Sequence, residues 1–141
     1  MRIWPPALKI HLVGQCDYLG EWLRLWNGRL DLIDEVIHPQ FVAHNPSSPK
    51  LGREQLREII SKLRAHFDVF SVKADLGPVV QGDLVAGRWI AVAVSAGEAS
   101  HWVGQSIFRI LDGQIIEHWE VNVQLQGVPF DLSGISPALR P

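Results

Sequence analysis

The sequence predicts an α+β domain in which a strongly curved antiparallel sheet closes over N-terminal helices as a cone-shaped α+β barrel. Apolar residues recur at helical spacing in the first half of the chain, whereas side chains alternate with a period of two after residue 67. The connections between the alternating segments are short, which favours antiparallel neighbours. The open end of such a cone is the natural place for a pocket.

The first half of the chain is predicted to form three helices and one short strand. The first helix covers about residues 12–30, the second covers 31–37, and Pro39 ends the second because the residue before a proline avoids helical angles. A strand at 41–44 and a third helix at 53–67 follow. The apolar stripe of the first helix comprises Leu12, Cys16, Leu19, Leu23, Trp26 and Leu30. That of the third comprises Leu56, Ile59, Ile60, Leu63 and Phe67.

Four strands are predicted at residues 69–81, 84–95, 100–111 and 114–124. The last two are joined by Asp112-Gly113, and an Asp-Gly pair between alternating segments is the strongest short-range signal for a hairpin. Residues 127–141 contain three prolines and no period. We therefore expect one domain over 1–127 and a surface-lying tail over 128–141.

Composition limits the classes of function. The chain has 141 residues, a net charge of −2 and no cluster of Lys and Arg, which argues against nucleic acid or an anionic membrane as a partner. No apolar run is long enough to span a bilayer, and the first residues lack the apolar core of a secretory signal. Cys16 is the only cysteine, so a reducing, cytoplasmic setting is expected.

Aromatic residues are the compositional oddity, since the chain has six tryptophans and one tyrosine. Each of them is more often core than ligand contact, but several indoles around one cone would favour a flat, apolar or polycyclic ligand. The residues that we expect to contact such a ligand are Tyr18, Trp22, Trp26, Trp89 and Trp102.

The last predicted strand has two faces. Glu117, Trp119, Val121 and Val123 share one face, and His118, Glu120 and Asn122 share the other. The second face would more often be a solvated or dimer-facing surface than a site. A β-bulge would instead turn Asn122 inward.

For each of the candidate residues Glu117 and His44, the sequence allows two interpretations. Glu117 on an inward face is either a catalytic group or the partner of Arg88 or Arg109 in an ion pair. His44 is either an acid or base near neutral pH or a histidine bonded to the loop that follows it. No metal-ligand spacing and no glycine-rich phosphate loop is present, so neither a metal nor a nucleotide cofactor is expected.

Five segments resemble the SnoaL-like polyketide cyclases of the nuclear-transport-factor-2-like superfamily, over about residues 15–125. The segments are Trp26-Asn27-Gly28, residues 32–44, residues 52–57, residues 82–89 and residues 107–119. The resemblance implies a commonly dimeric cone with a deep apolar pocket on the Trp119 face. It also implies pocket carboxylates at the positions of Ser106 and Val123, neither of which is acidic here, and a pocket-mouth histidine at His44.

The leading hypothesis is therefore a cyclase or isomerase for a hydrophobic polyketide- or terpenoid-like substrate. His44, Glu117 and Asn122 would handle protons or polarise a carbonyl, and Arg88, Ser106, Trp119 and Val123 would join the aromatic residues in binding. The first alternative is a non-catalytic apolar ligand-binding or dimerisation domain. The second is epoxide opening with Glu117 or Asp83 near Arg88. A homodimer is expected in each case.

Overall fold

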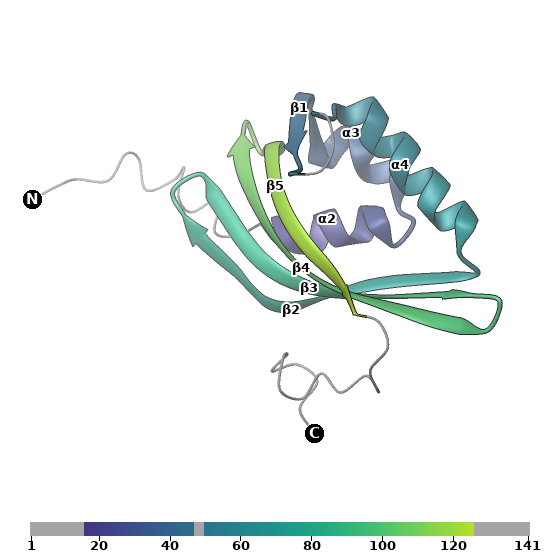
Figure 1. Ribbon diagram of the computed structural model, residues 1–141. Coiled ribbons are helices and arrows are strands. Elements are labelled where there is room, and N and C mark those ends of the chain that lie inside the picture. The colour runs from purple at the N-terminus through teal and green to yellow at the C-terminus, as the bar shows by residue number, and fades with distance from the viewer. Residues whose placement is uncertain (1–15, 47–49, 126–141) are drawn as a thin grey trace, which may run out of the picture.

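The computed structural model describes residues 16–46 and 50–125, so the predicted tail at 128–141 lies outside the described residues. Five strands form one curved sheet, and the α-helices of the described residues pack on its concave side (Figure 1). This arrangement confirms the predicted α+β fold. Within these ranges no helix combines the length and the apolar character needed to cross a membrane.

The sheet is mixed and open, where the sequence predicted an antiparallel barrel. Its strand order is β1-β5-β4-β3-β2, and the two edges are not joined. The strands are β1 (Ile37–His44), β2 (Val69–Gln81), β3 (Leu84–Ser95), β4 (Glu98–Leu111) and β5 (Gln114–Leu125). Strands β2 to β5 form the predicted antiparallel meander, but β1 pairs with β5 in parallel.

Asp17 is the N-cap of helix α2 (Tyr18–Trp26). Its Oδ1 accepts a hydrogen bond from the backbone N–H of Gly20 at 2.8 Å. The prediction that Cys16 lies in the buried stripe is wrong, since Cys16 precedes the helix and is exposed. Residues 12–15 of the predicted helix lie outside the described residues. Tyr18 and Trp22 are among the most buried side chains.

Asn27 fastens the end of α2 to the sheet. Its side-chain Nδ2 donates to the Val72 carbonyl oxygen at 2.8 Å, and the Val72 N–H donates to its Oδ1 at 2.9 Å. Gly28 follows with φ +112, a left-handed angle that suits the residue after a helix. Trp22 and Trp26 are thereby held over the concave face of the sheet.

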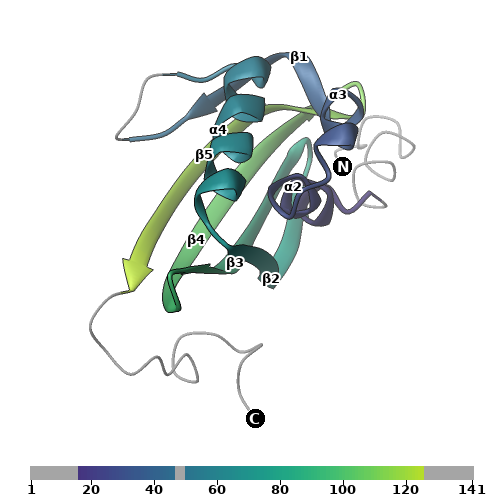
Figure 2. The same cartoon turned by 90° about the vertical axis from the view of Figure 1, so that its right-hand side faces the viewer.

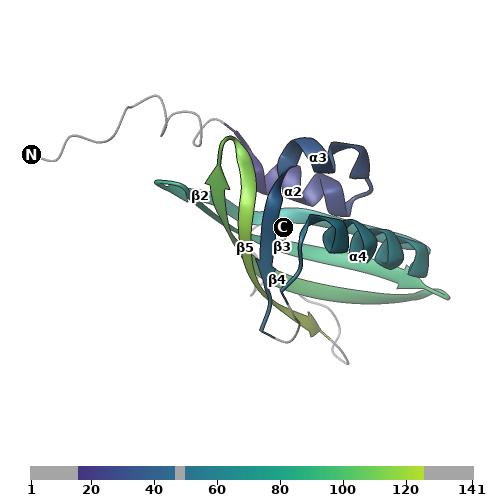
Figure 3. The same cartoon turned by 90° about the horizontal axis from the view of Figure 1, so that it is seen from above.

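The predicted helix at 31–37 is a 3₁₀ turn, η1 (Leu30–Leu32), followed by α3 (Ile33–Val36). Strand β1 starts at Ile37, four residues before its predicted start. It can include Pro39 because an edge strand tolerates a residue without a backbone N–H. Helix α4 (Arg53–His66) buries Leu56 and Ile60, whereas Ile59 is 36% exposed. Figures 2 and 3 show α2 and α4 on the same side of the sheet.

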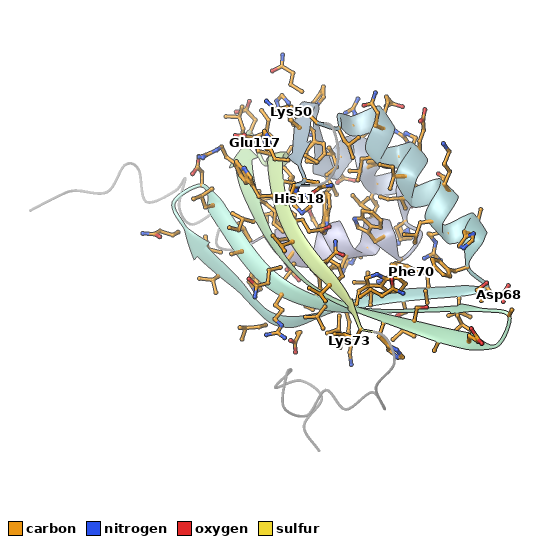
Figure 4. The ribbon with its side chains drawn as sticks, viewed as in Figure 1. Lys50, Asp68, Phe70, Lys73, Glu117 and His118 are labelled. Carbon is orange, nitrogen blue, oxygen red and sulfur yellow. The ribbon has the colours of Figure 1, made fainter. Side chains whose placement is uncertain are left out.

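A β-bulge near the start of β5 decides which of its side chains face the helices. Ile115 pairs with Ile110, but the next pair is Glu117 with Arg109, so Ile116 is an extra residue on β5. The inward-facing positions therefore change from odd to even numbers, from Ile115 to His118. His118 consequently lies between the sheet and the helices (Figure 4).

Candidate functional site

A cavity of about 160 Å³ lies between α2, α4 and the concave face of strands β2 to β5. Four of the five tryptophans in the described residues line it, as the composition led us to expect, and Phe70 adds a further aromatic ring (Figure 4). The lining residues are Trp22, Leu23, Trp26, Leu63, Phe70, Val72, Trp89, Ala91, Trp102, Glu120 and Asn122. Such a wall suits an apolar ligand.

Glu120 is the one ionisable side chain among these lining residues. Its side chain is 15% exposed. One carboxylate oxygen, Oε1, accepts a hydrogen bond from the Ser106 hydroxyl at 3.3 Å, and Oε2 accepts one from Asn122 Nδ2 at 3.1 Å. Burial raises the pKa of Glu120, and the hydrogen bonds from Asn122 and Ser106 oppose that rise.

Behind Glu120, hydrogen bonds among the buried side chains of Trp89, Ser106 and His118 connect strands β3, β4 and β5. The Trp89 indole N–H donates to Ser106 Oγ at 3.0 Å, and His118 Nε2 lies 3.1 Å from the same oxygen. His118 is 2% exposed, and burial, helped by the nearby His44, lowers the pKa of His118 to about 3. The imidazole is therefore neutral at pH 7. Its approach to Glu120 Oε1, 3.6 Å from Nε2, is not an ion pair at that pH.

Gly104 makes room for the Trp89 ring. It pairs with Trp89 on one side and with Asn122 on the other, and a Cβ atom at this position would collide with the Trp89 indole. The ring therefore lies across the backbone of β4. This position brings the Trp89 indole N–H within hydrogen-bond distance of Ser106, which lies two residues after Gly104 on β4.

The expectation that the Trp119 face of β5 lines the pocket is wrong. Trp119 pairs with Ile107 on the outer face of the sheet, where Val121 is 64% exposed and Val123 is 57% exposed. The bulge at Ile116 is the physical reason, because it places even-numbered residues inside. Asn122 lines the cavity, as the bulge alternative predicted. Glu120, assigned to the outer surface from the sequence, lies beside it.

Two of the predicted catalytic residues, His44 and Glu117, contact each other, but they do so on the outer face of the sheet. His44 Nε2 lies 3.0 Å from Glu117 Oε2, and the His44 ring stacks on Trp119 with centroids 5.3 Å apart. Arg109 Nε is 3.1 Å from Glu117 Oε1, and Arg109 Nη1 is 2.9 Å from Asp83 Oδ2. Neither His44 nor Glu117 lines the cavity. The ion-pair interpretation of Glu117, with Arg109, matches this geometry.

The remaining predicted contacts also lie outside the cavity wall. Arg88 pairs with Asp75, with 3.3 Å between Nε and Oδ2, and Tyr18 is buried in the core. Ser106 lies behind the wall, where it is hydrogen-bonded to the lining residues Trp89 and Glu120. No arginine is among the lining residues. The epoxide-opening hypothesis, which needs a carboxylate beside Arg88 in the pocket, is therefore not supported.

The described residues add no metal centre to this site. Among residues 16–46 and 50–125, no group of three or more His, Cys, Asp or Glu side chains could hold a metal ion. The arrangement inside the cavity is thus one carboxylate with a raised pKa, one amide and an aromatic wall. A carboxylate whose pKa is raised by burial can act both as a base and, once protonated, as an acid.

The sequence profile of the SnoaL-like domain matches residues 19–118. The chain belongs to the SnoaL-like family. No curated protein matches the sequence of this SnoaL-like protein. The match covers α2 from Leu19 onward and the sheet up to His118 on β5, so Glu120 and Asn122 lie just beyond it.

Solved structures agree with this assignment. A loop-truncated variant of IdmH is 27% identical, with a TM-score of 0.68, and the match covers 75% of this chain and 90% of that one. Wild-type IdmH, a candidate polyketide cyclase from Streptomyces antibioticus, is 24% identical with a TM-score of 0.67 over 75% and 89%. TsrD from Streptomyces laurentii is 21% identical with a TM-score of 0.65 over 84% and 91%.

Proposed function

We propose that this SnoaL-like protein is a cyclase or isomerase that moves a proton on a carbon next to a carbonyl group of an apolar substrate. The observation that carries the proposal is Glu120, the single ionisable group in an aromatic cavity, with a pKa raised by burial. Enzymes raise the pKa of a carboxylate in this way when it must act as both base and acid.

In the proposed reaction, ionised Glu120 removes a proton from the carbon and the protonated Glu120 returns it to another atom of the substrate. Asn122 already gives one N–H to Glu120 Oε2, and its second N–H suits a substrate oxygen at the rim of the cavity. The aromatic wall keeps the substrate in a reactive conformation, which itself lowers the barrier. Wild-type IdmH, which has a similar fold, is a candidate polyketide cyclase.

The size and charge of the cavity indicate the part of the substrate that enters it. A volume of about 160 Å³ is close to that of a cavity that holds one benzene ring. No basic side chain lines the wall, so an anionic group inside would face Glu120 with no compensating charge. We therefore propose that one uncharged ring of a polyketide- or terpenoid-like molecule is bound, which is smaller than the polycyclic ligand expected from the sequence.

Proton exchange in deuterated water tests the proposal. With benzyl acetoacetate as the probe, we expect the protein to accelerate deuterium incorporation between the two carbonyls, followed by ¹H NMR. For the same ester with a carboxylate on its ring, we expect little acceleration of deuterium incorporation over the rate in buffer. If thermal shift shows that the probe binds and exchange stays at the rate in buffer, the protein is a binding domain, and the proposed catalysis is wrong.

We also propose that the protein forms a homodimer through the outer face of β4 and β5. Val121 and Val123 are largely exposed there and lie beside Ile107, and a contiguous exposed apolar patch commonly marks an interface. Sedimentation should give a dimer for the wild type and a monomer for Val121→Asp. Val79→Asp is the matched control, because Val79 on β2 is 63% exposed and should leave the dimer intact. A monomeric wild type would refute the proposal.

A further inference from the structure

Ser106 has three polar neighbours, as many as one hydroxyl can bond. Its Oγ lies 3.0 Å from Trp89 Nε1, 3.3 Å from Glu120 Oε1 and 3.1 Å from His118 Nε2. The side chain is 1% exposed. The orientation of this hydroxyl must therefore be decided by these three neighbours.

A count of donors and acceptors leaves two arrangements. A serine hydroxyl has one hydrogen and two lone pairs. The Trp89 indole can only donate, so it always occupies one lone pair of Ser106. One hydrogen and one lone pair remain, and Glu120 and His118 must share them.

The protonation state of Glu120 selects between the arrangements. When Glu120 is ionised it can only accept, so Ser106 donates to Glu120 and the remaining lone pair accepts from His118 Nε2–H. When Glu120 is protonated at Oε1, it can donate to Ser106. The Ser106 hydrogen then points to His118 Nε2, which must be unprotonated, with the ring proton on Nδ1.

We propose that Ser106 positions Glu120 in both of its protonation states by turning its hydroxyl between Glu120 and His118, so that His118 changes tautomer whenever Glu120 gains or loses a proton. In this change one ring nitrogen of His118 releases a proton to solvent as the other takes one up, and the ring stays neutral. Ser106 is a positioning residue, and its importance for catalysis rests on the proposed function of Glu120.

The surroundings leave few other partners for this exchange. The side chains of α2, α4 and strands β2 to β4 that line the cavity are not ionisable, so His118 is the titratable neighbour of Glu120. His44 on β1 is the further titratable group that acts on His118. Burial disfavours the imidazolium, so His118 does not simply take the proton of Glu120. Asn122 bonds only the other oxygen, Oε2, and is fixed as a donor.

Nuclear magnetic resonance of the 141-residue chain without ligand tests this inference. The side-chain ¹⁵N shifts of His118 and the ¹³C shift of the Glu120 carboxyl group are followed as pH is lowered. We expect the protonated nitrogen of His118 to change from Nε2 to Nδ1 with the same midpoint as Glu120. A His118 tautomer that stays constant through the titration of Glu120 would overturn the proposal.

Two variants distinguish the proposed coupling of His118 to Glu120 through Ser106 from an ordinary hydrogen bond to Glu120. In Ser106→Ala, Glu120 loses a donor to its charged form, so its midpoint should rise by about one pH unit and His118 should no longer follow it. In Asn122→Ala the midpoint should also rise, but His118 should still follow. Persistence of the tautomer change in Ser106→Ala would show direct coupling of His118 and Glu120, which contradicts a role for Ser106.

The result of this NMR titration is independent of the result of the deuterium-exchange assay. The titration uses no substrate, so the tautomer change can be observed even if the protein does not catalyse deuterium exchange. Conversely, exchange that depends on Glu120 can occur with a constant His118 tautomer. Because the wild-type titration needs no substitution, the result does not depend on whether Ser106→Ala folds.

Discussion

Glu120→Gln is expected to slow deuterium exchange of benzyl acetoacetate by at least about a hundredfold, the lower range of what a general acid or base contributes. Glutamine has nearly the same shape and can still accept from Ser106, but its amide cannot take up a proton. Binding of the probe, measured by quenching of tryptophan fluorescence, should change little. Initial rates at saturating probe give the comparison.

Glu117→Gln is the matched control, since Glu117 lies on the same strand but on the outer face with Arg109 and His44. The exchange rate of this variant should stay within about threefold of the wild type, because no proton-transfer step is lost. A strong loss in Glu117→Gln with little change in Glu120→Gln would place the chemistry on the outer face. That result would refute the proposed function.

The pH dependence of the rate follows from the same group. Removal of the substrate proton requires ionised Glu120, so activity should fall as pH drops through the pKa of this residue. Because burial raises that pKa, the fall should occur at a higher pH than for an exposed glutamate. The residual rate of Glu120→Gln should lack this transition. A wild-type profile that is flat across the acidic range would exclude Glu120 as the base.

Trp22→Ala should lower the free energy of unfolding by about 3–5 kcal/mol, the range for truncation of a large buried aromatic side chain. Trp22 is almost fully buried at the centre of the core. Its ring centroid is 5.3 Å from that of Phe108 and 4.2 Å from that of His118. Urea unfolding followed by circular dichroism gives the difference.

Trp102→Ala is the comparison for Trp22→Ala, because Trp102 also lines the cavity but is only partly buried. We expect a clearly smaller loss of stability, since less apolar surface returns to water when Trp102 is removed. Equal losses in the two variants would mean that the core of this domain is not centred on Trp22. The packing described for α2 would then be wrong.

The strands could be predicted closely because their signals are local. Turn sequences such as Asp112-Gly113 and period-two alternation fixed β2, β3 and β5 to within one residue, and β4 to within two. The parallel placement of β1 beside β5 had no such signal. It depends on contacts between residues about 75 positions apart, such as His44 with Trp119.

The indole wall was also predictable, since Trp22, Trp26, Trp89 and Trp102 all line the cavity. The catalytic candidates were not, because they depended on which face of β5 turns inward. Counted from the two-residue turn without a bulge, Ser106 pairs with Trp119, whereas the structure pairs it with Glu120. A difference of one residue exchanges the two faces.

A physical signal for the bulge was present. In the unbulged register Glu117 would face Phe108 in the core, where a charge without a partner is costly. The bulge moves Glu117 opposite Arg109, and a carboxylate paired with a guanidinium is far less costly than one left alone. The bulged register still places one carboxylate inside, Glu120, where Ser106 and Asn122 donate hydrogen bonds to it. The pairing of Glu117 with Arg109 was therefore one signal for the bulge.

The sequence by itself determined the α+β fold, the meander and the aromatic character of the cavity, because turns and hydrophobic periods act over a few residues. Only the tertiary structure decided which carboxylate enters the cavity and which pairs with arginine outside. That choice follows from one extra residue at Ile116 in β5, whose position is set by packing and charge pairing between strands. Local propensity does not distinguish the two registers.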